Sequence, residues 1–195
     1  MILGLTGSMG SGKTSAAKYF KKLQVHIVDA DEISRQITSN NKAIDKLVEI
    51  FGKQIIYKNG RLNRKKLARI IFSNAELRLQ CERVLHPLIK LEIKKQISQF
   101  SKNDFVVLDA PLLFEAGLDK LCDKTLVVWT KESLIAPRLK ARHFSAAEIK
   151  ERRNAQMPDD KKMQKADFVI DNSYSIKTLE KNIEALFWQI NKSKK

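Results

Sequence analysis

The sequence predicts an α/β protein with a five-stranded parallel sheet and helices on both faces, in a three-layer arrangement. Two observations lead to this prediction. Five short, almost entirely apolar segments alternate with longer segments that have the hydrophobic spacing of helices, a pattern typical of strands buried on both faces. The chain has 195 residues, of which 43% are hydrophobic, so it is long enough for one domain with a sizeable core.

The expected elements can be placed in chain order. Strands are expected at residues 2–6, 25–28, 105–108, 125–129 and 168–170. Helices are expected at residues 15–23, 32–51, 62–100, from 130 through 142, 145–156, from 158 onward, and 176–190. Asn63 and Asn74 are expected N-caps. Pro87 predicts a kink or break near His86, and Pro137 biases the residue before it away from helix.

A glycine-rich segment between the first strand and the first helix matches the P-loop pattern GxxxxGK[ST] in full. Glycines let successive backbone N–H groups point at one phosphate, and the next helix presents its positive N-terminal end. Lys13 can reach the β and γ phosphates of ATP, and the Thr14 hydroxyl can ligate Mg²⁺. Without nucleotide, the Lys13 side chain is expected to reach into solvent. The predicted nucleotide-binding residues are Gly7, Ser8, Met9, Gly10, Ser11, Gly12, Lys13, Thr14 and Ser15.

Three aspartates follow predicted strands, at the edge where ligands of open α/β sheets bind. Asp109 closes the third strand, where a carboxylate near the Mg²⁺ shell is expected. Asp29 and Asp31 follow the second strand. The pattern leaves two roles for Asp29, capping of the next helix and catalysis. Asp31 is better placed to face an acceptor hydroxyl.

Arginines in the last third of the chain suggest a lid over the transferring phosphate. Arg138 and Arg142 are four residues apart and share a helix face, while Arg152 and Arg153 follow after a short turn. The alternative is a solvated basic face without a role in the reaction.

Composition limits the partners, cellular location and cysteine chemistry that the sequence allows. There are 37 Lys and Arg against 22 Asp and Glu, a formal charge of +15, which favours anionic partners. No aromatic residue lies within the basic stretch at residues 61–69, so nucleic acid is not expected as a partner. The absence of a long apolar run and of a signal-peptide pattern predicts a cytoplasmic protein that does not bind membranes. Two separate cysteines predict no disulfide or zinc site.

In its motifs the sequence resembles the dephospho-coenzyme A kinase family over nearly its whole length. The resemblance rests on Leu5-Thr-Gly7 with the P-loop, Val28-Asp-Ala-Asp31 with Ile33 and Arg35, Phe51-Gly52, Gly60-x-Leu62-x-Arg64, His86-Pro87, Asp109-x-Pro-Leu-Leu-Phe-Glu115, Arg138-x-x-x-Arg142, Gln156, Ala166-Asp167-x-Val-Ile170 and Asn172.

The resemblance implies transfer of the ATP γ-phosphoryl group to the ribose 3′-hydroxyl of dephospho-coenzyme A, the final step of coenzyme A synthesis. It implies Asp31, Lys13, Arg138 and Arg142 as catalytic residues, with ATP and Mg²⁺ as cofactors. It also implies Asp29, Arg35, Arg64, His86 and Asp109 as substrate-binding residues, His86 having a purely structural role as its alternative. Another P-loop nucleoside or nucleotide kinase and a nucleic-acid-stimulated ATPase are the competing functions.

The resemblance further implies one P-loop kinase domain in three parts. These are a core at about residues 1–30, 103–135 and 166–195, a helical coenzyme A-binding insertion at about 31–102, and a lid at about 136–165. The oligomeric state is expected to be a monomer or a weak homo-oligomer. Ser8, Asn63 and Ile135 depart from residues that are frequent in the family, which affects the start of the P-loop and details of the lid rather than the reaction.

Overall fold

The structure, a computed structural model, describes the chain apart from residues 142–144, 146–148, 150–152, 155 and 193–195. The chain forms two compact units, which we call the sheet unit and the helical unit. The sheet unit comprises Met1–Val28 and Phe100–Lys195, and the helical unit comprises Asp29–Gln99. The helical unit covers almost the same residues as the predicted insertion, and its assignment to the substrate remains a proposal.

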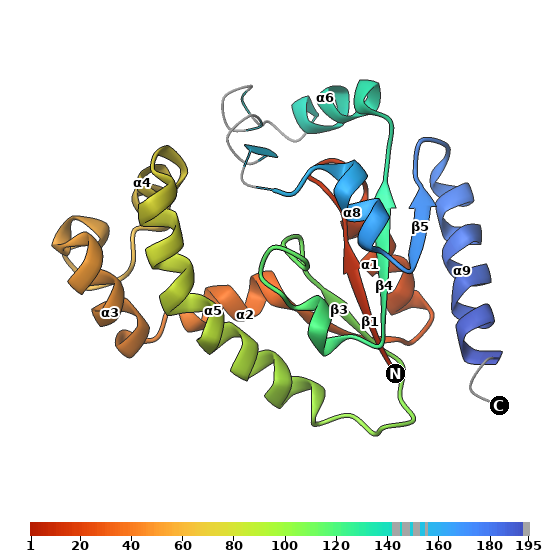
Figure 1. The fold of residues 1–195 in the computed structure, drawn as a ribbon, viewed down its shortest axis with the longest axis horizontal. Coiled ribbons are helices and arrows are strands. Elements are labelled where there is room, and N and C mark those ends of the chain that lie inside the picture. Colours follow the sequence, from red (N-terminus) through yellow and green to blue (C-terminus); the bar gives the residue numbers. More distant parts are fainter. Residues whose placement is uncertain (142–144, 146–148, 150–152, 155, 193–195) are drawn as a thin grey trace. The chain divides into compact units, whose positions relative to one another are not determined.

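Five strands form the sheet, in the order β2-β3-β1-β4-β5 (Figure 1). They are β1 (Ile2–Thr6), β2 (His26–Asp29), β3 (Val106–Asp109), β4 (Lys124–Trp129) and β5 (Phe168–Asp171). Strand β1 pairs in parallel with β3 and β4, and β4 pairs in parallel with β5. This arrangement confirms the predicted α/β class. Because Leu5 lies opposite both Asp109 and Leu126, the ends of these strands reach the same edge of the sheet.

The two faces of β1 bury different neighbours, as the period-two alternation of a strand requires. Leu3 and Leu5 are fully buried in a core cluster with residues of α1 (Lys13–Lys22) and α9 (Ile176–Lys192). On the opposite face, a Cβ built at Gly4 would lie 2.8 Å from Cys122 Sγ, so the segment after β3 packs closely there. Helix α8 (Asp159–Lys165) contacts β4. The sheet is therefore covered on both sides.

The helical unit has its own core. It contains α2 (Ala30–Ile37), α3 (Asn41–Phe51), the short 3₁₀ helix η1 (Lys53–Ile55), α4 (Arg64–Ser73) and α5 (Ala75–Ile97). Its buried side chains are Ile44, Leu47, Phe51, Ile55, Leu62, Leu67 and Cys81. The predicted caps are confirmed: the Asn63 side chain accepts a hydrogen bond from Lys66 N, and Asn74 accepts from Glu76 N and Leu77 N.

The prediction of one helix over residues 32–51 is wrong, because the chain forms two. Helix α2 ends at Ile37, and Asn40 caps α3 by accepting a hydrogen bond from Lys42 N at 2.9 Å. Thr38, Ser39 and Asn40 form side-chain hydrogen bonds with the local backbone. Side chains of this kind compete with helical hydrogen bonds and favour caps, which explains the break.

Neither internal proline ends its helix. Helix α5 continues through Pro87, and α6 (Glu132–Lys140) contains both Ala136 and Pro137. Burial holds α6 together across the proline, since Ile135 and Leu139 on either side are 1% and 0% exposed. Of the kink or break predicted near His86, the break does not occur, and the expectation of a non-helical Ala136 is wrong.

Other predicted features have clear outcomes. Helix α1 begins at Lys13, two residues before the predicted start. Cys81 and Cys122 are free thiols. The helix predicted at residues 145–156 falls mostly outside the described residues. Within the described part of the chain, no helix has the length and apolarity needed to cross a membrane.

Candidate active site

The P-loop turns tightly between β1 and α1 because two glycines allow neighbouring segments to approach. Gly12 has φ 102°, in the left-handed region, and is the N-cap of α1. A Cβ added there would lie 2.0 Å from Asn172 Nδ2, and one added at Gly7 would lie 2.4 Å from the Val128 carbonyl oxygen. Any side chain at either position would displace the loop from β4 and from the end of β5.

The second half of the loop is held by two side chains on its outer side. Asn172 Nδ2 donates to the Ser11 carbonyl oxygen at 2.7 Å. Arg138 Nη1 lies 3.5 Å from the Gly10 carbonyl oxygen. These two contacts use carbonyl groups of the loop and occupy none of its N–H groups.

The first half of the loop is held by the segment that leads into α8. The Gln156 side chain accepts a hydrogen bond from Met9 N at 3.2 Å, and the Ser8 hydroxyl donates to Asp159. The side chain at position 8 therefore anchors the start of the P-loop.

Lys13 and Asp109 form an ion pair at the carboxyl edge of the sheet. Lys13 Nζ lies 2.6 Å from Asp109 Oδ1, and the two side chains are 14% and 10% exposed. The expectation that Lys13 extends into solvent is therefore wrong. The carboxylate holds the ammonium group at the edge of the sheet, and a phosphate group would be a competing anion.

The oxygen groups at this edge suit Mg²⁺. Thr14 is exposed in the first turn of α1, and Asp109 is a carboxylate on the neighbouring strand. The described residues contain no cluster of three or more His, Cys, Asp or Glu side chains that could hold a metal ion. Mg²⁺ is commonly held by one or two oxygen ligands of the protein, with waters and phosphate oxygens as its other ligands.

Arg138 lies beside the P-loop and forms hydrogen bonds with neutral oxygen atoms. Its guanidinium group donates to the Asn172 carbonyl oxygen at 2.9 Å and to Thr130 Oγ1 at 3.3 Å. These acceptors are neutral, and none of the ion pairs among the described residues includes Arg138. A positive charge held next to the loop is thus available to a bound anion. The second predicted lid arginine, Arg142, lies outside the described residues, as does Arg152.

Arg153 differs from Arg138 because it is paired with an acid. Its guanidinium group binds both carboxylate oxygens of Glu132, with Nη2 2.7 Å from Oε2. The hydrogen bond from Arg153 lowers the pKa of Glu132. Arg153 therefore connects the segment before α8 to the start of α6.

In the helical unit, Asp29 and Asp31 occupy different positions in α2. The Asp29 side chain is the N-cap, accepting hydrogen bonds from Asp31 N at 2.8 Å and Glu32 N at 3.0 Å. Asp31 lies in the first turn of the helix and is exposed. Of the two predicted roles of Asp29, the structure shows the cap.

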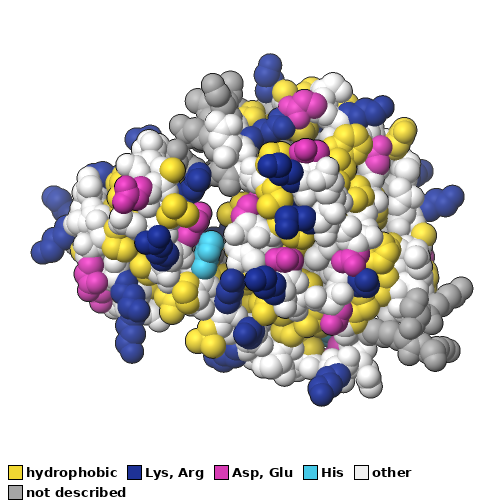
Figure 2. All heavy atoms as spheres, viewed as in Figure 1, with side chains coloured by type: hydrophobic (Ala, Val, Ile, Leu, Met, Phe, Trp, Pro, Cys, Tyr) yellow, Lys and Arg dark blue, Asp and Glu magenta, His cyan; other side chains and the backbone are white. Residues whose placement is uncertain are grey.

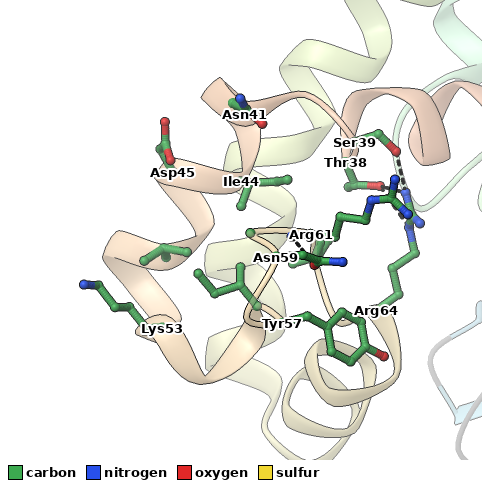
Figure 3. A pocket seen from close by; sticks show the side chains of 14 residues that line it. Thr38, Ser39, Asn41, Ile44, Asp45, Lys53, Tyr57, Asn59, Arg61 and Arg64 are labelled. Atoms are coloured by element: carbon green, nitrogen blue, oxygen red, sulfur yellow. Dashed lines mark hydrogen bonds between the residues drawn. The ribbon is translucent and has the colours of Figure 1, made fainter.

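Arg35 and Arg64 lie close together at the end of α2. Arg35 is exposed and forms an ion pair with Glu32. The hydrogen bond to Glu32 raises the pKa of Arg35. Arg64 donates to the Arg35 carbonyl oxygen at 2.7 Å and to the hydroxyls of Thr38 and Ser39 at 3.0 Å (Figure 3). Arg64 therefore caps the carboxyl end of α2.

His86 is half-buried on α5. Burial lowers its pKa, with a smaller opposing effect of Glu82, so the neutral imidazole is favoured near neutral pH.

Comparison with known proteins identifies the family. A family model described as dephospho-CoA kinase matches residues 1–178. The chain belongs to the dephospho-CoA kinase family. A dephospho-CoA kinase of Bacillus cereus is 37% identical over 196 residues, covering 97% of this chain and 98% of that protein. One from Carboxydothermus hydrogenoformans is 41% identical over 186 residues, covering 93% and 90%.

Solved structures agree with this membership. A crystal structure from Thermus thermophilus has a TM-score of 0.83 and 30% identity, and the match covers 97% of each chain. A dephospho-CoA kinase from Campylobacter jejuni has a TM-score of 0.74 and 26% identity, covering 100% of this chain and 98% of that one. A shikimate kinase from Acinetobacter baumannii, with a TM-score of 0.56 and 15% identity, shares the fold.

This dephospho-CoA kinase family member also buries a charged side chain that was not among the predicted site residues. Lys162 on α8 is 0% exposed, and its Nζ atom lies 3.1 Å from Glu115 Oε1 and donates to the Pro111 carbonyl oxygen at 3.0 Å. Glu115 also accepts a hydrogen bond from Met157 N at 2.7 Å. The pair joins α8 to the segment after β3. Glu115 was visible as a motif residue, but a lysine among lysines in a short polar helix gives no sign of burial.

Proposed function

We propose that this protein transfers the γ-phosphoryl group of ATP to the ribose 3′-hydroxyl of dephospho-coenzyme A, forming coenzyme A and ADP. The observation that carries the proposal is a complete P-loop with a lysine–aspartate pair at the carboxyl edge of the sheet, in a chain of the dephospho-CoA kinase family. We expect a small-molecule enzyme of the cytoplasm.

Phosphoryl transfer depends on positioning and on neutralising charge. The P-loop N–H groups would bind the ATP phosphates while their outer contacts keep the loop in shape. Lys13 would exchange its ion pair with Asp109 for phosphate oxygens and so follow the charge that develops on them. Thr14 would hold Mg²⁺, with Asp109 nearby, and the ion would supply neutralisation of phosphate charge when bound.

On the acceptor side, Asp31 is the proposed base. An exposed carboxylate in the first turn of α2 can orient the 3′-hydroxyl and accept its proton. Asp29 would support it indirectly by capping the helix. Arg138 would stabilise charge on the nucleotide from its place beside the P-loop, and Arg142 would act with it as part of a lid that excludes water.

The helical unit is the proposed location of the dephospho-coenzyme A molecule. Arg35 supplies an exposed cation for the pyrophosphate, one helical turn after Asp31. His86, kept neutral by burial, can offer a hydrogen bond to the adenosine. Arg64 would contribute mainly by holding the end of α2 in place.

A nucleic-acid-stimulated ATPase is supported only by the charge of +15. Figure 2 shows Lys and Arg side chains spread over the visible face, with Asp and Glu side chains among them. On this face, such a mixed distribution favours a solvated basic surface over a continuous groove for a phosphate backbone.

An ADP-release assay with a panel of acceptors tests the proposal. With dephospho-coenzyme A we expect rapid ADP release, with adenosine and AMP much slower release, and with DNA no stimulation. Preference for adenosine or AMP would indicate a different nucleoside or nucleotide kinase. Stimulation by DNA that declines steeply with salt would indicate the nucleic-acid ATPase.

A further inference from the structure

The segment that leads into α8 contacts the P-loop at two neighbouring residues. The hydroxyl of Ser8, a residue that is 7% exposed, donates to Asp159, and Met9 N donates to the Gln156 side chain at 3.2 Å. These contacts join residues that are 151 and 147 positions apart in the chain, and both lie within the sheet unit. We call residues 156–162 the brace.

The brace is also joined to the segment after β3. Glu115 on that segment accepts a hydrogen bond from Met157 N at 2.7 Å and lies 3.1 Å from Lys162 Nζ, in a lysine side chain that is 0% exposed. Lys162 also donates to the Pro111 carbonyl oxygen at 3.0 Å. The brace is therefore fixed to a second part of the sheet unit and can support the P-loop.

The contacts of the brace fix one peptide unit of the P-loop. The carbonyl group of Ser8 and the N–H group of Met9 belong to the same planar unit. Its N–H donates to Gln156, and its carbonyl oxygen accepts a hydrogen bond from Ser11 N at 3.0 Å. Rotation of this unit would break both hydrogen bonds and redirect the loop. The bond from the Ser8 side chain to Asp159 holds the residue at the start of the unit.

We infer that Gln156 and Asp159 are positioning residues for the nucleotide, because they hold the peptide unit between Ser8 and Met9 in the orientation at which the P-loop binds phosphate. The inference rests on the proposed function for the identity of the ligand, a nucleotide phosphate. When a loop samples other orientations, its affinity for the ligand falls by the fraction of molecules in the competent orientation.

The alternative role of Asp159 is to stabilise α8, since an acid in the first turn of a helix interacts favourably with the helix dipole. Asp160 lies in the same turn and is exposed, so it shares this effect. The sign of the charge effect separates the roles further. Removing a carboxylate reduces repulsion of an anionic ligand and should tighten phosphate binding, whereas losing a positioning contact should weaken it.

Calorimetric titration with ADP tests the inference. Asp159→Ala and Ser8→Ala should each raise the Kd for ADP roughly tenfold, because a hydrogen bond to a charged group is lost. The double variant Ser8→Ala/Asp159→Ala should match Asp159→Ala within about twofold, because both changes remove the same contact. Asp159→Asn should restore most of the affinity, since its amide oxygen can accept from Ser8. Asp160→Ala is the matched control, and its Kd should not rise.

Gln156→Ala gives independent evidence, because it removes the acceptor of Met9 N. The Kd for ADP should rise several-fold, and in turnover the KM for ATP should rise while the KM for dephospho-coenzyme A stays unchanged. Thermal melting confirms that each variant is folded at the temperature of titration. A role in stability alone would lower the Tm and leave the Kd for ADP unchanged.

An ADP Kd within about twofold of wild type in both Asp159→Ala and Gln156→Ala would overturn the inference, as would additive effects of Ser8→Ala and Asp159→Ala. If Asp159→Ala does not fold, Ser8→Ala and Gln156→Ala decide by the same criterion. ADP titration needs no acceptor, so it also separates this inference from the proposed function. If the variants lose ADP affinity but the wild type transfers no phosphate to dephospho-coenzyme A, only the proposed function fails.

Discussion

Asp29 and Asp31 are two residues apart, and it is the Asp29 side chain that accepts hydrogen bonds from Asp31 N and Glu32 N at the start of α2. The Asp-Ala-Asp sequence indicated both residues as candidates and left capping and catalysis open for the first. The distinction depends on the residue at which the helix starts. A helix boundary is decided by backbone geometry, which a sequence pattern places only to within a few residues.

Asp31→Asn tests the proposed base. The change keeps the shape of the side chain and removes its charge, so kcat should fall about 10²–10⁴-fold while the Kd for ATP stays unchanged. Asp29→Asn is the matched control, because asparagine caps a helix as well as aspartate does. Steady-state rates and nucleotide titrations measure both effects, and a normal kcat for Asp31→Asn would refute the assignment.

Lys13→Ala tests the cation of the P-loop. Turnover should fall by about 10²–10³-fold or more, because a charge at the developing phosphate oxygens is lost. The Tm should also fall, since Asp109 loses an ion pair in a mostly buried place. Adding Asp109→Asn should restore part of the Tm and none of the activity. If both variants keep wild-type kcat, the P-loop assignment fails.

At the scale of elements, all five strands were predictable to within one residue at each end, because buried parallel strands are short apolar runs. The break at residues 38–40 was missed because the apolar spacing of α2 and α3 continues across it. Pro87 and Pro137 do not end α5 and α6, and in α6 the burial of Ile135 and Leu139 outweighs the local effect of the proline. The burial of Lys162 likewise depends on tertiary contacts.

Lys162→Met should destabilise the protein by about 3 kcal/mol, because it leaves the Glu115 carboxylate without its cation in a mostly buried site. The double variant Glu115→Gln/Lys162→Met should be more stable than Lys162→Met alone. Lys161→Met is the control, since Lys161 is exposed on the same helix. Urea denaturation measures all three, and a loss in Lys161→Met equal to that in Lys162→Met would contradict the role of the pair.

Asp167 should make the pairing of β4 and β5 sensitive to acid. Burial raises the pKa of Asp167, but hydrogen bonds from Lys124 and Thr125 outweigh it and lower the pKa below its usual value of 3.8. A carboxyl group with a lowered pKa stabilises the fold above pH 3.8, and this contribution disappears as the pH falls through the folded-state pKa.

The Tm difference between wild type and Asp167→Asn should therefore be constant from pH 7 to about 5 and shrink below about pH 4. Melting curves measured by circular dichroism across this range provide the test. A Tm difference that grows toward low pH would show that folding raises the pKa of Asp167 rather than lowering it.

At the scale of the whole molecule, the α/β class and the P-loop could be predicted, because hydrophobic pattern and glycine spacing are local signals. The contacts that shape the loop could not be predicted from the sequence, because they come from Gln156, Asp159 and Asn172, which lie about 150 residues further along the chain. A pocket in the helical unit, lined by residues between Thr38 and Arg64 (Figure 3), was also hidden, because its volume depends on how α3 packs beside the loop before α4.

The central claim is that phosphate is transferred to the 3′-oxygen of dephospho-coenzyme A. Proton-coupled ³¹P NMR of the product formed from ATP and dephospho-coenzyme A tests it most directly. The account predicts one new phosphomonoester signal, coupled to the ribose H3′ proton, formed in equal amount to ADP and absent with Lys13→Ala. A phosphate on the 2′-oxygen or elsewhere on the molecule, or ADP formed without any phosphorylated acceptor, would contradict the account.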